Sequence, residues 1–224
     1  VNSSSFPQLD EQKLDQLMAE VQLLSLGNLI PLNICVDLPQ LLSELEPFRS
    51  EWIDYLPRKD RVNNRKGLSL FGLPGDSLRD GLSMPEACQR KNRILSELDF
   101  CSPTELFEKC RSLHGLFDFF GPVGRSFFVK CDRGGWFYPH RDHPNLFRPS
   151  FRIVVFCKNS KAGEYDWFLD GRRIEIEEGR AYYINTRLVH KTISYVDESI
   201  HLIMNIPVTF ENSQRVLRAL QHTH

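Results

Sequence analysis

The sequence predicts an α+β protein, with helices in its N-terminal half and a double-sheet jelly roll in its C-terminal half. Before Gly121, apolar residues recur at spacings of three and four, which is typical of one face of a helix. After Gly121, apolar and aromatic residues fall into short runs with no helical pattern between them. Asp170 and Gly171 join two of these runs with the two-residue signal of a β-hairpin. Short strands at this spacing favour a jelly roll.

Two helices are expected before residue 48. The first begins after Asp10 and stops near Gly27. Its expected buried stripe consists of Leu14, Leu17, Val21 and Leu24. The second starts at Asp37, a good N-cap residue, and stops at Pro47. We therefore expect residues 1–35 to form a helical extension and residues 36–224 to form one domain, with the jelly-roll core at about 122–210.

The middle of the chain carries weaker patterns. A short strand is expected at residues 68–73 and a helical piece around residues 86–97. Ser102, Pro103 and Glu105 have the spacing of a capping box, which predicts a helix that starts there. Before the short strand stand five cations, Arg58, Lys59, Arg61, Arg65 and Lys66. These cations line the mouth of a site for an acidic substrate, or they belong to a solvated loop.

Each expected strand of the jelly roll is a short run of apolar and aromatic residues. They are residues 126–131, 136–138, 151–156, 167–169, 174–176, 181–184, 192–195 and 200–206.

The composition is that of an ordinary globular protein. The 224 residues are 41% hydrophobic and 25% charged, with a formal net charge of −1. The overall charge therefore gives no reason to expect nucleic acid or an anionic membrane as a partner. The six cysteines include no C-x-x-C pair, which argues against a zinc ribbon or a disulfide framework. No apolar run is long enough to span a bilayer and no signal-peptide pattern is present, so a soluble, cytoplasmic protein is expected.

A histidine and a carboxylate two residues apart point to metal chemistry. His140 and Asp142 lie at the end of an aromatic run, and residues at this spacing share a face in an extended chain. Tyr138 shares that face, so it is expected to contact a bound ligand. With His190, which follows a later strand, the pair makes the two-histidine, one-carboxylate triad of non-heme Fe(II) oxygenases. Such a triad leaves metal positions open for a bidentate co-substrate and O2. An H-x-D tripeptide also occurs by chance, and a histidine near a strand end can be a surface residue.

Several motifs between about Trp52 and Ile206 are shared with a known family. They are Trp52…Tyr55-x-Pro57-Arg58, Arg65-x-Gly67-Leu68-Ser69-Leu70, Gly134-Gly135 before His140, Ile184-Asn185-Thr186 before His190, and the final run from His201 to Ile206. On these residues the sequence resembles the aspartyl/asparaginyl β-hydroxylase-like branch of the 2-oxoglutarate- and Fe(II)-dependent oxygenases, and bacterial free-proline hydroxylases are similar too. The resemblance implies a double-stranded β-helix (jelly-roll, cupin) fold. It also implies hydroxylation of a C–H bond, coupled to decarboxylation of 2-oxoglutarate to succinate and CO2.

One position departs from the family pattern. The family usually carries an arginine shortly after the distal histidine, where it pairs with the far carboxylate of 2-oxoglutarate, and this sequence has Ser199 there. Arg152 is expected to take over this role, with Ser199 and His201 as hydrogen-bonding partners, because a guanidinium is the best partner for a carboxylate in a low-dielectric site. Lys130 and Arg148 are further candidates. Arg152 could instead be a strand-end arginine in solvent.

The sequence thus predicts an Fe(II)- and 2-oxoglutarate-dependent dioxygenase. Its expected substrate is a small amino acid or a peptide, hydroxylated on a side chain of the Asp, Asn or Pro kind. The departure at Ser199 keeps a second interpretation open, a non-oxygenase cupin that binds a small acidic ligand or a structural metal. A third is a protein-interaction domain that uses the basic segment 58–66.

Overall fold

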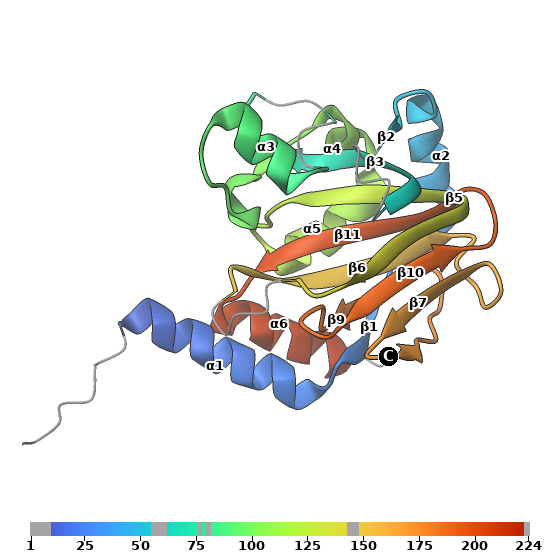
Figure 1. Ribbon diagram of the computed structural model, residues 1–224. Helices are drawn as coiled ribbons and strands as arrows, with labels where there is room; N and C mark the ends of the chain where they lie inside the picture. The colour runs from blue at the N-terminus through green and yellow to red at the C-terminus, as the bar shows by residue number, and fades with distance from the viewer. Residues whose placement is uncertain (1–9, 55–61, 76–77, 79–81, 143–147, 222–224) are drawn as a thin grey trace, which may run out of the picture.

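The computed structural model of the chain describes residues 10–54, 62–75, 78, 82–142 and 148–221 (Figure 1). Residues 58–61 of the expected basic segment lie outside these ranges, whereas Arg65 and Lys66 belong to β3 (Val62–Gly72). Within the described part of the chain, no helix is long and apolar enough to cross a membrane.

The first helix, α1 (Glu11–Leu26), has the predicted limits but buries a different face. The Asp10 carboxylate accepts a hydrogen bond from the Lys13 backbone N–H, and Gly27 ends the helix. The buried residues are Ala19, Glu20 and Leu23, whereas Leu14, Val21 and Leu24 of the expected stripe are 47%, 60% and 42% exposed. The expected stripe was wrong because spacings of three and four fit more than one face of this helix, and the packing partner decides which face is buried.

The strand β1 (Leu29–Cys35) was not predicted. It pairs antiparallel with β9 (Arg180–Ile184) at the end of the sheet, where Pro31 is tolerated because an edge strand needs no second row of N–H donors. The expected helical extension at residues 1–35 therefore contains a strand of the main sheet. After it, α2 (Leu38–Leu45) starts at Asp37 as predicted, and the 3-10 turn η1 (Glu46–Phe48) follows.

The segment before the jelly roll consists of short elements. They are β2 (Ile53–Asp54), β3, α3 (Met84–Lys91), η2 (Glu97–Asp99), β4 (Ser102–Pro103), α4 (Glu105–Lys109), η3 (Arg111–Leu113) and α5 (His114–Phe120).

The capping box expected at Ser102 was wrong. Ser102 pairs with β3 in β4, and the N-cap of α4 is Thr104. The Thr104 hydroxyl donates to the Ser69 carbonyl at 2.7 Å, so it serves the sheet and not the helix. The structure has a capping box at Ser96 and Asp99 instead.

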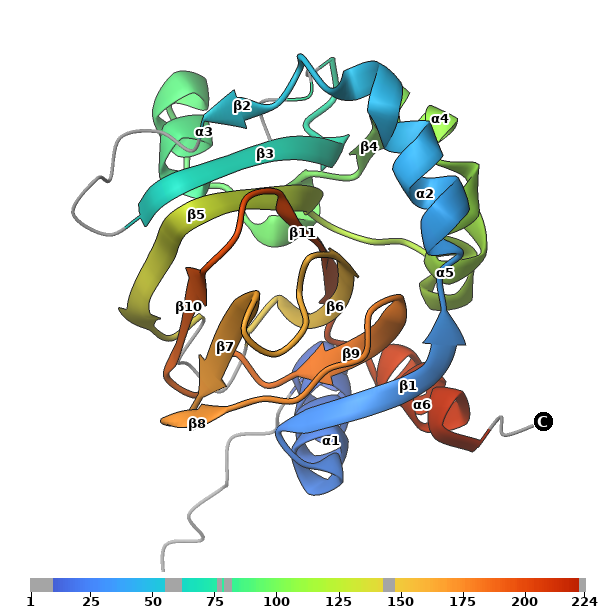
Figure 2. The ribbon, with the colours of Figure 1, turned by 90° about the vertical axis from the view of Figure 1, so that its right-hand side faces the viewer.

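The C-terminal half is the predicted jelly roll. Its elements are β5 (Ser126–His140), β6 (Ser150–Lys158), β7 (Tyr165–Leu169), β8 (Arg172–Arg173), β9, β10 (His190–Ser194), β11 (Ser199–Pro207) and the final helix α6 (Phe210–Gln221). The strand order is β1-β9-β6-β11-β5-β10-β7-β8. The first part of β5 pairs with β11 and its second part with β10, so this one strand joins the two halves of the curled sheet (Figure 2). This order is that of a double-stranded β-helix and confirms the predicted fold class.

Two local features shape the roll. Gly134 has a φ of +73° and lies where β5 passes from β11 to β10, a conformation that glycine adopts without strain. The strand expected at residues 174–176 was wrong, because β8 ends at Arg173. Ile174 still donates its backbone N–H to the Trp167 carbonyl at 2.9 Å.

The alternation along β6 separates two parts of the apolar core. Phe151, Ile153 and Val155 face a large cluster that also contains residues of α1, α2, α5 and α6. Val154 and Phe156 face the inside of the roll. Because side chains alternate along a strand, Arg152 also points inside. In Figure 1, α1 and α6 lie together on the outside of the sheet.

Candidate metal centre

The structure brings His140, Asp142 and His190 together. His140 is the last residue of β5 and His190 the first of β10, and the two are direct cross-strand neighbours. Asp142 follows β5, and its backbone N–H donates to the Thr186 carbonyl at 2.9 Å, which ties it to the segment before β10. One ligand atom from each of the three residues lies within 4.8 Å of the other two. The described residues at this point therefore fit one metal ion.

Backbone acceptors set the tautomer of both histidines. The Nδ1 atom of His140 is 2.8 Å from the Tyr138 carbonyl, and that of His190 is 3.0 Å from the Leu188 carbonyl. A carbonyl oxygen can only accept, so each Nδ1 carries the proton and each Nε2 keeps its lone pair. The Nε2 atom of His140 lies 3.5 Å from Asp142 Oδ1, and the Nε2 atom of His190 lies 3.5 Å from Asp142 Oδ2. Fixing the far ring nitrogen in this way is the usual support for a metal-binding histidine.

The electrostatics favour the protonation states that a metal needs. Burial, followed by the charge of the other histidine, lowers the pKa of His140 to about 4, and burial also lowers the pKa of His190. Burial by itself raises the pKa of Asp142, but Arg152 and the two histidines outweigh it and hold that pKa below its usual value. At neutral pH the three residues are two neutral imidazoles and one carboxylate, which is the donor set for Fe(II).

Arg152 supports the carboxylate of Asp142. Its Nη1 atom lies 2.9 Å from Asp142 Oδ2, and the side chains of Arg152 and Asp142 are only 13% and 17% exposed. The strand-end arginine in solvent that the sequence left open is therefore not what the structure shows. Arg152 also lines the adjoining cavity, so it lies beside any ligand that reaches the metal.

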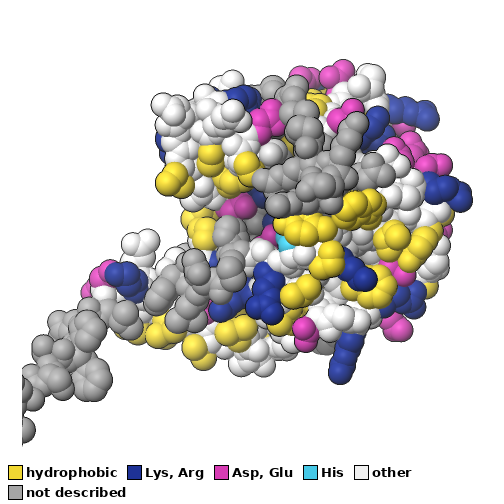
Figure 3. Space-filling view, in the orientation of Figure 1, with side chains coloured by type: hydrophobic (Ala, Val, Ile, Leu, Met, Phe, Trp, Pro, Cys, Tyr) yellow, Lys and Arg dark blue, Asp and Glu magenta, His cyan; other side chains and the backbone are white. Residues whose placement is uncertain are grey.

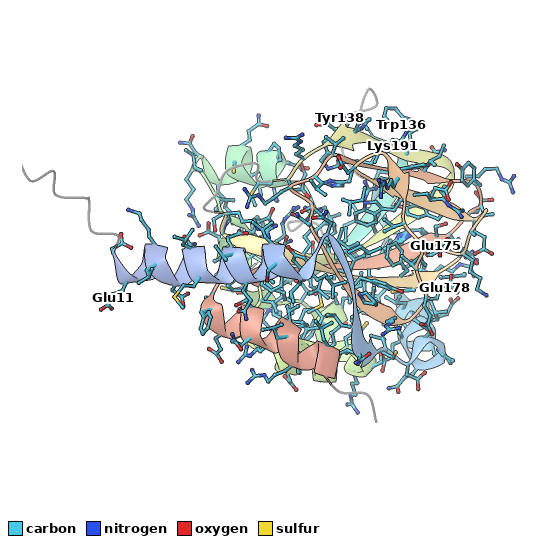
Figure 4. All side chains as sticks on the ribbon, turned by 90° about the horizontal axis from the view of Figure 1, so that it is seen from below. Glu11, Trp136, Tyr138, Glu175, Glu178 and Lys191 are labelled. Carbon is cyan, nitrogen blue, oxygen red and sulfur yellow. The ribbon has the colours of Figure 1, made fainter. Side chains whose placement is uncertain are left out.

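A cavity of about 290 Å³ opens in front of the three residues. Its lining includes Tyr138, Arg152 and His201 from the expected set, together with Phe137, Tyr165 and Trp167. Among the described residues, the buried indole N–H of Trp167 has no hydrogen-bond partner, which leaves a donor for a ligand. Figure 3 shows a histidine side chain at the surface beside hydrophobic side chains, and Figure 4 shows Tyr138 with Trp136 and Lys191 away from the layer of α1 and α6.

Of Ser199 and His201, which were both expected to hydrogen-bond the co-substrate, His201 lines the cavity and Ser199 does not. The Ser199 hydroxyl donates to the Asn159 carbonyl at 2.7 Å, and Ser199 does not line the cavity. His201 does line it, with its ring 4.1 Å from that of Tyr165. Burial, then the charge of Arg65, lowers the pKa of His201 to about 3. His201 is therefore neutral at pH 7, and it brings no positive charge to the cavity.

Arg65 is the cation that sequence reasoning did not single out for this site. It lies on β3 opposite Cys131 of β5, and its guanidinium carbon is 4.6 Å from the centre of the Phe137 ring. It lines the same cavity, and its charge helps to lower the pKa of both His190 and His201. Arg65 is one of the five cations between residues 58 and 66 for which the sequence offered an acidic substrate as a partner. The pairing of β3 with β5 is what places Arg65 in the cavity lining.

The other two cations considered lie elsewhere. Lys130 stands over the Trp52 ring at 4.8 Å and lines a separate pocket. Arg148 is buried against Glu20 of α1, with 2.6 Å between its Nε atom and a carboxylate oxygen.

Comparison with known proteins gives likenesses of fold. No family model and no curated protein matches the sequence. Similar solved structures include a Pseudomonas putida prolyl-4-hydroxylase, at 16% identity, with 85% of this chain and 98% of that chain covered and a TM-score of 0.47. A Trichoplax adhaerens prolyl hydroxylase in complex with a hypoxia inducible factor peptide fragment shares 11% identity over 94% of this chain and 97% of that chain, with a TM-score of 0.47. KdgF from Halomonas sp. shares 20% identity over 37% of this chain and 67% of that chain, with a TM-score of 0.29. These likenesses concern the fold alone.

Proposed function

We propose that the protein is an Fe(II)- and 2-oxoglutarate-dependent dioxygenase that hydroxylates the side chain of a free or peptide-bound amino acid. The observation that carries the proposal is the donor set of His140, Asp142 and His190, with both Nε2 lone pairs fixed toward one carboxylate. These three residues would hold Fe(II), which supplies the activation of O2 when bound.

The protein residues around the metal would orient the ligands. Arg152 holds the Asp142 carboxylate ionised and in one orientation. We place the far carboxylate of 2-oxoglutarate at Arg65, because a guanidinium inside a cavity of low dielectric binds a carboxylate strongly. His201, which is neutral, and the Trp167 indole N–H lie in the same wall and can share in hydrogen bonding. Tyr138, stacked on His140 with 5.2 Å between ring centres, would cover the mouth side of the metal.

The test is metal and co-substrate binding followed by turnover. Under anaerobic conditions, calorimetric titration of the metal-free protein with Fe(II) and then with 2-oxoglutarate should show both bind, the second only after the first. Admission of O2 should then release succinate. The variant His190→Ala should lose all three signals, whereas His114→Ala, which changes a histidine outside the cavity lining, should keep them.

A non-oxygenase cupin that binds a small acidic ligand is the second candidate. The observation that favours it is the neutral His201 on β11, the strand on which the resemblance leads one to expect an arginine. This candidate predicts that metal and a small acid bind while no succinate forms from 2-oxoglutarate.

A further inference from the structure

The cavity in front of the candidate metal centre is lined by more cations than carboxylates. Among the described residues that line it are four arginines, Arg65, Arg125, Arg141 and Arg152, and one carboxylate, Asp142. A cavity with an excess of one sign of charge and apolar walls concentrates ligands of the opposite sign. A divalent metal on the three proposed ligands would add to this positive charge. The described lining therefore favours the binding of anionic ligands.

Arg125 and Arg152 are each paired with a carboxylate of the protein. Arg125 makes two contacts with the Glu97 carboxylate, at 2.5 and 3.0 Å, and a third with the Leu82 carbonyl at 3.2 Å. Both Arg125 and Glu97 are buried, so this pair is a fixed part of the wall. Arg152 holds Asp142. A ligand carboxylate that bound Arg125 or Arg152 would have to compete with Glu97 or Asp142 for the guanidinium.

The other two arginines lie at different depths. Arg65 is half-buried against Phe137, and its positive charge helps to lower the pKa of the buried His201. Arg141 is exposed and stands in the chain between two of the proposed metal ligands, His140 and Asp142. No ion pair or hydrogen bond of the Arg141 side chain is found within the described ranges of the chain.

We propose that the primary substrate is a carboxylate-bearing molecule, and that Arg141 at the cavity mouth receives its carboxylate. This inference rests on the proposed function, in which Arg65 binds the far carboxylate of the co-substrate deeper in the cavity. A guanidinium grips a carboxylate with two parallel hydrogen bonds, so Arg141 would fix the orientation of the substrate as well as its charge. The short chain distance from Arg141 to His140 and Asp142 would bring the substrate close to the metal. A cavity of about 290 Å³ suits a small acid or one side chain of a peptide.

The test compares acids with their neutral counterparts. The full chain is loaded anaerobically with Fe(II) and 2-oxoglutarate, and binding of the common amino acids, their N-acetyl forms and their carboxamides is measured by calorimetry. We expect at least one acid to bind at least tenfold more tightly than its carboxamide. The variant Arg141→Gln should weaken binding of that acid at least tenfold and remove its advantage over the carboxamide, and Arg141→Lys should restore part of it. The control Arg133→Gln removes an exposed arginine of β5 outside the cavity lining and should keep the preference.

Three results would overturn the inference: carboxamides that bind as tightly as acids, an unchanged acid affinity in Arg141→Gln, or no acid bound at all. Failure of the proposed function is seen separately, as a metal-loaded protein that does not bind 2-oxoglutarate in the first titration.

Discussion

The carboxylate of Asp142 is a proposed metal ligand and also pairs with Arg152, so removing it should damage both the proposed metal site and the fold. Its side chain is 17% exposed and lies 2.9 Å from a guanidinium of Arg152 that is 13% exposed. In Asp142→Ala the Arg152 charge stays in place without its partner, and breaking such a buried pair from one side costs about 3–5 kcal/mol. Because both side chains keep some contact with water, we expect a loss of about 3 kcal/mol in the free energy of unfolding.

The double variant Asp142→Ala/Arg152→Met separates the two roles. It removes both charges, so most of the lost stability should return, while metal binding stays lost because a ligand is still missing. The single variant Arg152→Met keeps all three proposed ligands and loses only the group that orients Asp142. Its metal affinity should fall about 10- to 100-fold, as is usual when a supporting partner of a ligand is removed.

Two measurements on the metal-free proteins decide the outcome. Urea unfolding, extrapolated to water, gives the free energy of unfolding of each variant. Calorimetric titration with Fe(II) under anaerobic conditions gives the metal affinity. If Asp142→Ala binds Fe(II) as tightly as the parent protein, the ligand assignment is wrong. If the double variant is no more stable than Asp142→Ala, the ion pair with Arg152 is not what that substitution disrupts.

Three further predictions concern single side chains. The folded pKa of His201, about 3, lies below its usual value of 6.5, so its contribution to stability is complete above pH 6.5 and is lost as pH falls; at pH 5 the loss should be about 2 kcal/mol. Because His140 and His190 lose stability over the same range in both proteins, urea unfolding at pH 7 and 5 should show a loss about 2 kcal/mol larger in the parent than in His201→Gln, and equal losses would contradict burial of a neutral ring. Arg65→Met should raise the Kd for 2-oxoglutarate at least tenfold and change that for Fe(II) much less, and equal effects in the two titrations would point to a structural role. Glu20→Gln should lower the free energy of unfolding by about 3 kcal/mol, because Glu20 is fully buried between Arg148 and Arg187, and the exposed substitution Glu11→Gln should cost under about 0.5 kcal/mol.

Local patterns in the sequence determined the types of the elements. The limits of α1 follow from Asp10 and Gly27, and the start of α2 follows from Asp37, because capping depends on neighbouring backbone groups. Most strands of the roll follow from runs of apolar and aromatic residues. The proximity of His140 and Asp142 was also predictable, since a spacing of two is a local constraint.

Contacts between distant segments decided the rest. The buried face of α1 is the one that packs against the sheet and α6. Residues 29–35 form a strand because they pair with β9 through backbone hydrogen bonds. His190 meets His140 only through the register of β10 against β5, and Arg65 enters the cavity only because β3 pairs with β5. The sequence by itself therefore determined which chemical groups the protein has for a metal site. The tertiary structure decided which cations lie beside the three proposed metal ligands, because that depends on distances between side chains that the chain order does not contain.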